Sequence, residues 1–453
     1  MARTLPRFAL RTDSRQPEEK AEACPGWLPI LGSTLEFTKL FNQFKIPFLM
    51  WDEYARRFGD VVGIRLGRDI FILVSGKEAI QEGLTKEEFD ARENSFLIQH
   101  RSMGVRRGVI FTDGEEWKEQ RRFTLRNLRD LGFGKRSMES MIREEAVELV
   151  SRLTEMGKKT GSKGVNMENM YTIPVLNSLW TMMSGQRCPQ DDESLRKFTG
   201  LVIENSRSVS SSARVINSFP WLRFFSPWFA RHHSIRNELW KYFEDTVDEH
   251  KKTKTDGDPR DLIDTFLDEM KKKKGEKSTF TEKQLIALCD DLFAGGTETT
   301  SNTLSFGTMY LLHHPDVQEK LHEELDRVVG KDRVPTIEDR PNLPYLNATL
   351  MEIRRCCNVG SLTLPHRCTK DTMFRGYFIP KGASILFRLR SVHMDPGYWG
   401  DPEVFRPERF LTPGENGGPM KVKEEPPWLI PFGLGGYLLI TEFYLLTNIY
   451  ING

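Results

Sequence analysis

A seven-residue segment in the middle of the chain combines two glycines with side chains that can carry protons. Residues 294–300 read Ala-Gly-Gly-Thr-Glu-Thr-Thr, inside a stretch with helical spacing of its apolar residues. Each glycine inside a helix costs roughly 1 kcal/mol relative to alanine, so we expect a compensating gain, such as close approach of a ligand to the backbone. Glu298 and Thr299 would supply an acid and a hydroxyl there. The alternative is that the hydroxyl bonds back to a carbonyl of the preceding turn.

A second group of side chains is suited to binding an anion. Trp117 and Arg121 are four residues apart, so they share one face of a helix. Such a pair can donate hydrogen bonds to an anionic group and shield it from water. His366, which follows Pro365, could donate in the same way. The alternatives are a structural cation–π contact for the pair and a surface position for the histidine.

Three charged residues in the last quarter of the chain could form a buried cluster. Glu352 and Arg355 are three residues apart on a predicted helix that starts after Pro344, so they can pair. Pairs at this spacing are common and weak on a surface. Arg409, in a Pro-Glu-Arg-Phe motif, could complete an Arg-Glu-Arg cluster that would be costly to break once formed.

The scaffold that must position these groups is predicted to be mainly α-helical with a minor β-sheet. Most of the chain from residue 77 to residue 357 has helical periodicity. A capping box at 281–284 begins a long buried helix that continues to residue 313, and residues 315–330 predict another helix. Between residues 60 and 75, two β-branched runs around a Gly-Arg-Asp turn predict a hairpin.

Composition excludes several functional classes. A chain of 453 residues can bury a core large enough to enclose a cofactor and an organic substrate. Its net charge is +1, from 65 basic and 64 acidic residues, so no overall field attracts nucleic acid. The 6 cysteines are scattered without a C-x2-C pair, which indicates a reducing compartment and argues against a disulfide framework or a structural zinc site.

Two further stretches have an unusual composition. The lysine-rich residues 271–277 predict a solvated loop. Residues 218–229, with the sequence SFPWLRFFSPWF, are strongly aromatic. We interpret them as ordinary core, and the alternative is an apolar surface that meets a membrane or a substrate.

The order of these motifs along the chain resembles the cytochrome P-450 superfamily of haem-thiolate monooxygenases. The order is Trp-x-x-x-Arg, Gly-Gly-x-Glu-Thr-Thr, Glu-x-x-Arg, Pro-Glu-Arg-Phe and Pro-Phe-Gly-x-Gly. The resemblance covers residues 24–435 and implies one mainly helical domain there, with a haem between two long helices. Segments such as 121–139 are similar to the microsomal clan, and most of all to its arthropod members, among which are those that epoxidise juvenile-hormone precursors.

The resemblance implies a role for each residue that matches a family motif. The residues it implies as hydrogen-bond donors to the haem propionates are Arg92, Trp117, Arg121 and His366. Those it implies as managing protons during oxygen activation are Glu298 and Thr299. Those it implies as structural are Glu352, Arg355 and Arg409. Those expected near an apolar substrate are Phe111, Phe293 and Leu362.

The resemblance also implies a reaction, partners and a location. The family inserts one oxygen atom into a lipophilic substrate, such as a hormone, lipid or xenobiotic, with electrons from NADPH through a reductase. Microsomal relatives are anchored in the endoplasmic reticulum membrane and face the cytosol. Residues 1–23 here are polar, so we expect a disordered leader without an anchor and a chain that is soluble or peripherally attached.

One position differs from the family pattern at the centre of its chemistry. After the Pro-Phe-Gly-x-Gly of residues 431–435, the pattern requires Arg, Cys and Gly where this chain has Tyr437, Leu439 and Thr441. The thiolate of that cysteine pushes electron density onto the iron and favours O–O cleavage. Leucine has no lone pair to donate, so the sequence predicts an inactive chain and leaves haem binding undecided.

The last residues, 436–453, predict an aberrant apolar tail. They contain one charged residue and have the composition of translated AT-rich non-coding sequence, as in a mis-spliced or truncated isoform. The fold would then be incomplete at the C-terminus, and the tail would be prone to aggregate. Three alternatives remain: a monooxygenase by family that is incomplete at both ends, a haem-free pseudoenzyme that binds a lipophilic ligand or a partner, and a non-functional splice product. Apolar surface left uncovered favours the third over the second.

Overall fold

The computed structural model has the mainly helical fold, with small sheets, that the sequence predicts. It describes residues 25, 28, 32–131, 136–190, 192–207, 211–255, 257, 259–414 and 420–433. The predicted leader, the predicted tail and Leu439 lie outside the described residues.

Helices provide most of the described secondary structure. The α-helices are α1 Thr34–Phe44, α2 Pro47–Phe58, α3 Lys77–Leu84, α4 Phe96–Arg101, α5 Gly114–Asp130, α6 Arg136–Thr160, α7 Thr172–Ser184, α8 Glu193–Arg207, α9 Ser211–Ser218, α10 Pro227–Thr253, α11 Leu262–Lys272, α12 Glu282–His313, α13 Pro315–Val328, α14 Pro344–Cys357, α15 Arg390–His393 and α16 Pro396–Trp399. The 3-10 helices are η1 Glu87–Phe89, η2 Gly161–Lys163, η3 Pro220–Phe225, η4 Ile337–Asn342 and η5 Pro407–Phe410.

The strands form one larger sheet and two small hairpins. They are β1 Val61–Leu66, β2 Asp69–Val74, β3 Ala91–Arg92, β4 His366–Arg367, β5 Thr372–Phe374, β6 Tyr377–Ile379, β7 Ser384–Phe387, β8 Leu411–Thr412 and β9 Lys421–Val422. The larger sheet has the order β1-β2-β7-β4-β3. The predicted hairpin is confirmed as β1 and β2, with Leu66 opposite Asp69. Because β2 pairs in parallel with β7, the sheet joins the two halves of the sequence.

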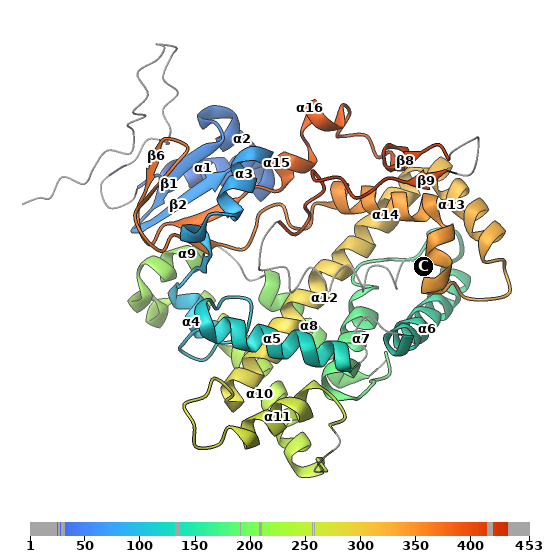
Figure 1. Ribbon diagram of the computed structural model, residues 1–453, viewed down its shortest axis with the longest axis horizontal. Helices are drawn as coiled ribbons and strands as arrows, with labels where there is room; N and C mark the ends of the chain where they lie inside the picture. The colour runs from blue at the N-terminus through green and yellow to red at the C-terminus, as the bar shows by residue number, and fades with distance from the viewer. Residues whose placement is uncertain are drawn as a thin grey trace, which may run out of the picture.

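The long helix α12 organises the fold. Figure 1 shows it running through the middle of the molecule, with the sheet and α1–α3 to one side and α5, α10 and α11 to the other. It packs against α7, α10 and α14, and most of its first three turns are buried. The predicted helix is therefore confirmed, and so is the helix predicted after it, α13.

Only half of the predicted capping box forms at the start of α12. The Thr281 hydroxyl accepts the backbone N–H of Gln284 at 3.2 Å, as expected for an N-cap. The Gln284 side chain does not return to Thr281; instead it exchanges two hydrogen bonds with the backbone of Gly108, at 3.1 and 3.3 Å. The start of α12 is thus fixed to the segment that precedes α5.

The interpretation of the aromatic stretch as core is wrong for its central part. Trp221, Phe224 and Phe225 lie on the short helix η3 and are 60%, 73% and 79% exposed. A 3-10 helix of six residues cannot bury all its faces, and the guanidinium of Arg223 lies 4.7 Å from the centroid of the Phe224 ring. The alternative, an exposed apolar surface, holds for these three residues.

The lysine-rich stretch is only partly the loop that the sequence predicts. Its first two lysines end α11, and Lys273 pairs with Glu119 of α5 at 2.6 Å. Among the described residues, no helix is long and apolar enough to cross a membrane. The five described cysteines are all free.

Candidate functional site

Arg92 and His366 are brought together by the sheet. They lie directly opposite each other on the antiparallel strands β3 and β4, and both are buried. His366 Nδ1 lies 2.8 Å from the carbonyl of Phe89. Burial, together with the positive charge of Arg92, lowers the pKa of His366 to about 3, so the imidazole is neutral at physiological pH.

Asp113 connects this pair of strands to helix α5. Asp113 is the residue before α5, and its carboxylate accepts the backbone N–H of Arg92 at 2.9 Å. Arg106 and Arg367 also donate to it, with Arg106 Nη2 at 3.1 Å and Arg367 Nη2 at 3.4 Å. Burial would raise the pKa of Asp113, but its hydrogen bonds with Arg106 and Arg92 hold the pKa below its ordinary value. Sequence reasoning missed Asp113, for which the only local signal was its place before a predicted helix.

Trp117 and Arg121 lie on one face of α5, as their spacing predicts, but they differ in how they are bonded. The Trp117 indole N–H donates to the carbonyl of Val109 at 3.1 Å. The Arg121 guanidinium carbon lies 5.4 Å from the centroid of the Trp117 ring, which is the cation–π contact of the alternative interpretation. Arg121 Nε is buried and has no acceptor among the residues that the structure describes. An anion beside α5 would supply that acceptor.

The glycine-rich segment lies at the centre of α12 and opens one face of the helix. The ten residues before it are buried, but Ala294 is exposed, and Gly295, Glu298 and Thr299 are half-buried. A face that is open in the middle of a packed helix leaves room for a flat apolar group. The Thr299 hydroxyl donates to the carbonyl of Gly295 at 3.1 Å, which is the back-bonding alternative.

A cavity of about 510 Å³ lies between the sheet and helices α4 and α10. Phe111 and Leu362 line it, as the sequence analysis expected. Phe293 does not: it is 1% exposed and packs against Trp180 and Phe198, with ring centroids 5.2 and 5.4 Å away. The expectation for Phe293 is therefore not met at this cavity, because its ring packs among other buried aromatic side chains of the core.

A buried ionic network closes one wall of this cavity. Arg101 and Arg236 both line it, and both bind Asp290 of α12, with N–O distances of 2.8 and 3.0 Å. Arg101 also pairs with Asp291. Burial works to raise the pKa of Asp290, but Arg101 and Arg236 hold it below its ordinary value. Sequence reasoning missed this network, although two adjacent acids inside an apolar helical run were a visible signal.

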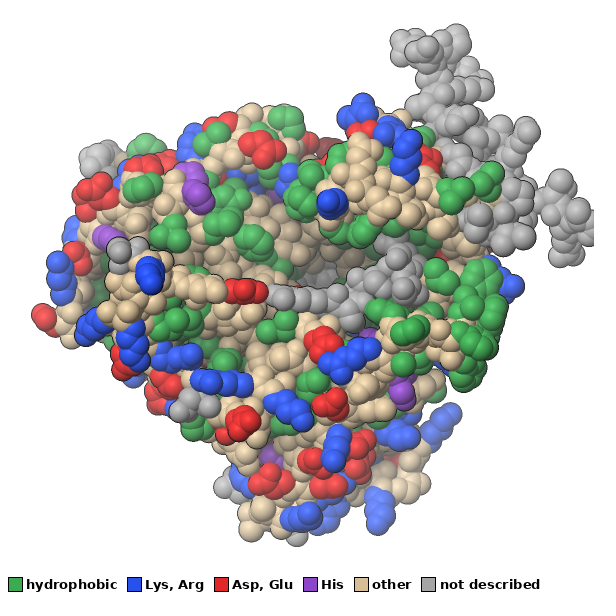
Figure 2. Space-filling view, turned by 180° about the vertical axis from the view of Figure 1, so that it is seen from behind, with side chains coloured by type: hydrophobic (Ala, Val, Ile, Leu, Met, Phe, Trp, Pro, Cys, Tyr) green, Lys and Arg blue, Asp and Glu red, His purple; other side chains and the backbone are tan. Residues whose placement is uncertain are grey.

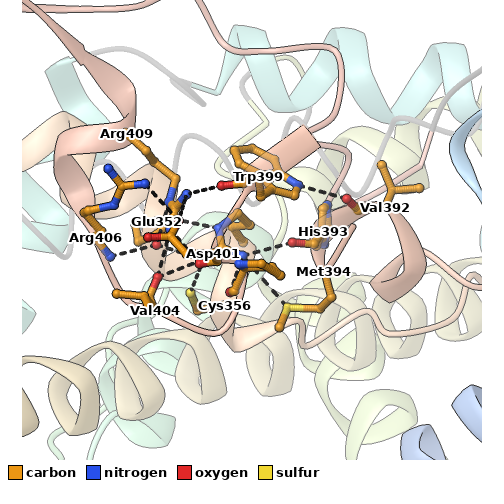
Figure 3. Close-up of polar contacts among 12 residues, drawn as sticks. Glu352, Cys356, Val392, His393, Met394, Trp399, Asp401, Val404, Arg406 and Arg409 are labelled. Atoms are coloured by element: carbon orange, nitrogen blue, oxygen red, sulfur yellow. Dashed lines mark hydrogen bonds and ion pairs between the residues drawn. The ribbon is translucent and has the colours of Figure 1, made fainter. Parts of the chain in front are cut away.

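Glu352, Arg355 and Arg409 form a buried cluster between α14 and η5. Arg355 makes a bidentate pair with Glu352 at 2.7 and 2.8 Å, and Arg409 Nε lies 3.0 Å from Glu352 Oε1 (Figure 3). The Trp399 ring lies under both guanidinium groups. Its centroid is 5.2 Å from the guanidinium carbon of Arg355 and 5.8 Å from that of Arg409. Charges this deeply buried persist only because each is paired and hydrogen-bonded.

The same cluster fixes the segment between α15 and η5. Arg355 Nη1 donates to the carbonyls of His393 and Pro402 at 2.9 and 2.8 Å. Arg409 donates to the carbonyl of Trp399 at 3.0 Å. The cluster therefore holds the backbone between α15 and η5, including the short helix α16. Trp399 and His393 belong to it although sequence reasoning did not single them out.

The short segment that follows this region ends the described part of the chain. Ile430 is buried, and its backbone N–H donates to His393 Nε2 at 3.0 Å. Gly433 has φ +80° and donates to the carbonyl of Ile430 at 3.0 Å, which closes a turn. Leu439, the position expected to hold the iron ligand, lies beyond the described residues.

The comparisons with known proteins agree with one another. A family model described as Cytochrome P-450 matches residues 23–436. The chain is 35% identical to farnesoate epoxidase of Bombyx mori over 436 residues, which covers 94% of this chain and 86% of that protein. It is 35% identical to a probable cytochrome P-450, 305a1, of Drosophila melanogaster over 94% of this chain and 85% of that protein. It is 33% identical to cytochrome P-450 2J5 of Mus musculus over 97% of this chain and 84% of that protein.

Proposed function

Because the chain belongs to the cytochrome P-450 family of haem monooxygenases, we propose that it keeps the family's lipophilic binding chamber but has lost the sulfur ligand of the iron. The observation that carries this proposal is the leucine at position 439, where the spacing after Pro431-Phe432-Gly433 calls for cysteine. A thiolate is needed to push electron density toward the iron. A hydrocarbon side chain cannot replace it.

The described residues fit the carboxylate side of a haem. Arg121 offers a buried N–H that has no acceptor in the described part of the chain. Arg92 and His366 lie side by side on the sheet, which Asp113 connects to the start of α5. The open face at Ala294 and Gly295 would receive the porphyrin ring. We assign Arg92, Trp117, Arg121 and His366 to the propionate site on this basis. Arg121 Nε is the donor without an acceptor among the described residues, whereas Trp117 Nε1 and His366 Nδ1 already lie at the carbonyls of Val109 and Phe89.

The described residues do not fit the iron side of a haem. A cysteine binds a metal as the thiolate, and burial raises the pKa of every described cysteine, which disfavours that form. The cysteines concerned are Cys188, Cys289, Cys356, Cys357 and Cys368. We therefore assign no oxidative step to this chain. A bound haem would supply oxygen activation in a relative that has the thiolate, and here it would be a ligand only.

Glu298 and Thr299 keep the proton-carrying groups of the family motif at the open face of α12. The Thr299 hydroxyl donates a hydrogen bond to the carbonyl of Gly295 at 3.1 Å. Glu298, one residue earlier and half-buried, is the acid that would exchange protons with solvent. Their proposed role is to hold protons at the open face of α12, where they would act only in a chain that has the thiolate.

The size and lining of the cavity favour a lipophilic ligand. Its volume, about 510 Å³, lies in the range of small-molecule sites, and most of its wall is apolar. The relative from Bombyx mori is named for its action on farnesoate. We propose an apolar molecule of that size class, a hormone, lipid or xenobiotic, as the ligand.

Two exposed surfaces are suited to contact with the partners of the family, a membrane and a reductase. Trp221, Phe224 and Phe225 form an exposed apolar patch, and Figure 2 shows hydrophobic side chains gathered on the edge of the molecule where η3 lies. We propose that this patch contacts the cytosolic face of the endoplasmic reticulum membrane. Exposed basic residues along α5 form a surface that would receive an acidic, NADPH-dependent reductase. These residues are Arg122, Arg126 and Arg129.

A haem-free protein that binds a lipophilic molecule is the second candidate function. The observation that favours it is the cavity, whose lining from the sheet, α4 and α10 includes none of the four residues assigned to the haem propionates. A turnover assay separates an active oxygenase from both inactive candidates. Supplied with haem, NADPH and reductase, this chain should give no oxygenated product from farnesoate-like substrates, whereas farnesoate epoxidase under the same conditions should. Product above the blank that lacks this chain would overturn the proposal.

A further inference from the structure

His393 is a buried histidine whose side chain accepts a hydrogen bond from a distant backbone. It is the last residue of α15, is 0% exposed, and accepts the N–H of Ile430 at its Nε2 atom, 3.0 Å away. Ile430 is itself buried and begins the turn that Gly433 closes. A side chain of α15 therefore holds the first residue of the last described turn.

The backbone of His393 is held by the buried charge cluster. Its carbonyl accepts a hydrogen bond from Arg355 Nη1 at 2.9 Å, and Arg355 is paired with Glu352. The preceding carbonyl, of Val392, accepts the Trp399 indole N–H at 2.9 Å (Figure 3). His393 thus links the two parts of the structure: its backbone is bonded to the cluster, and its side chain is bonded to the turn.

The histidine can act as an acceptor only while Nε2 carries no proton. Burial, together with the positive charges of Arg355 and Arg354 on α14 and Arg390 on α15, lowers the pKa of His393 to about 3. The ring is therefore neutral, with its proton on Nδ1. That N–H is buried and finds no acceptor among the described residues.

The unsatisfied Nδ1 argues against a role in packing alone. A leucine or phenylalanine would fill the same space without burying a polar atom that has no partner. The atom that distinguishes histidine from such a residue is then Nε2, which accepts the hydrogen bond from the backbone N–H of Ile430. The turn is also confined on another side, because the Pro431 carbonyl would lie 3.0 Å from a Cβ added at Gly360.

We propose that His393 is a positioning residue that fastens the turn of residues 430–433 to the cluster of Glu352, Arg355 and Arg409. The inference rests on the proposed function in one respect, since that function places this turn beside the haem. The contact itself stands without the haem.

Two neutral amides at position 393 provide the test. His393→Gln places a carbonyl oxygen close to the position of Nε2, whereas His393→Asn is one carbon too short to reach Ile430. Amide exchange of the peptide over residues 429–433 is measured for both, with α13 as the internal reference. We expect exchange roughly tenfold faster in His393→Asn, exchange close to that of the unchanged chain in His393→Gln, and no change in α13.

Equal exchange in the two variants, whether fast or slow, would overturn the proposal. If His393→Asn loosens the whole molecule, exchange in α13 rises too, and the proposal then requires that His393→Gln restore both regions. A haem titration of the same proteins adds the second readout: His393→Asn should broaden or shift the Soret band, and His393→Gln should not. If none of the three proteins binds haem, the proposed haem site fails, while the exchange data still decide the role of His393.

Discussion

The carboxylate of Asp291 occupies the space that a side chain on Gly108 would need. The two residues after Gly108 donate their backbone N–H groups to that carboxylate, at 2.6 and 2.8 Å. Since a buried carboxylate must be satisfied by donors, the contact fixes the path of the chain across α12. Phe111, at the wall of the cavity, lies at the end of this path.

Replacing Gly108 with alanine should therefore lower the free energy of unfolding by about 2 kcal/mol or more, because the new Cβ must displace Asp291 and strain a backbone with φ +84°. Gly104→Ala is the matched control, since Gly104 has φ +91° but no heavy atom within 4 Å of an added Cβ. Urea unfolding measures both. Equal losses in the two variants would show that backbone strain alone, without Asp291, is responsible.

Arg121→Gln should weaken haem binding by roughly tenfold without changing the midpoint of thermal unfolding. The reason is that its buried Nε has no acceptor in the described part of the chain, and a hydrogen bond to a charged group contributes about 1.5–3 kcal/mol. Haem titration followed by Soret absorbance measures the effect. The control is Arg122→Gln, an exposed neighbour on α5. An affinity unchanged in Arg121→Gln would remove this residue from the proposed propionate site.

Glu352→Gln should destabilise the protein by about 3–5 kcal/mol, because it leaves two buried guanidinium groups short of their counter-ion. Glu425→Gln breaks a similar pair with Arg354, at 3.0 Å, but Glu425 is 44% exposed, so its loss should cost less than about 1 kcal/mol. Denaturant unfolding of both variants gives the comparison. Losses of similar size would contradict a special role for the buried cluster.

Some of this site could be predicted from sequence, and the reasons are local. Glu352 and Arg355 pair because their spacing on a helix places them together, whatever else the chain does. His393 could not be found in this way, because its partner is the backbone of Ile430, whose position depends on the whole tertiary structure. Phe293 is absent from the cavity wall, and the sequence could not show this, because an apolar residue on a nearly all-buried helix has no periodic signal to orient it.

The aromatic stretch and the ionic network show the same limit. Composition alone cannot tell exposed aromatic residues from buried ones, and in this chain Phe225 is 79% exposed. The acids Asp290 and Asp291 were visible in an apolar run, but their partners, Arg101 and Arg236, come from helices far apart in sequence. Pairing of this kind is set by packing and not by spacing.

Acid should destabilise the fold through its buried neutral histidines. The pKa of His366 and of His393 is about 3 in the fold, below the ordinary 6.5 of an unfolded chain. Between these values the unfolded chain binds more protons, so stability rises with pH. The neutral histidines do not lower the free energy of unfolding above about pH 6.5. As the pH falls from there toward 3, protonation of the unfolded chain lowers it progressively.

Urea unfolding at a series of pH values from 7.5 to 4.5 measures this dependence. His393→Gln cannot take up a proton at that position, so its stability should fall less steeply with acid than that of the unchanged chain. Parallel curves for the two proteins would show that His393 does not bury a neutral ring.

The central claim is that no sulfur reaches the iron in this chain, and the spectrum of the reduced protein under carbon monoxide tests it most directly. The purified chain is loaded with haem, reduced and exposed to the gas, with farnesoate epoxidase treated in parallel as the thiolate reference. We predict either no bound haem or a Soret band without the red shift that a thiolate ligand produces. A red-shifted band equal to that of the reference would contradict the account.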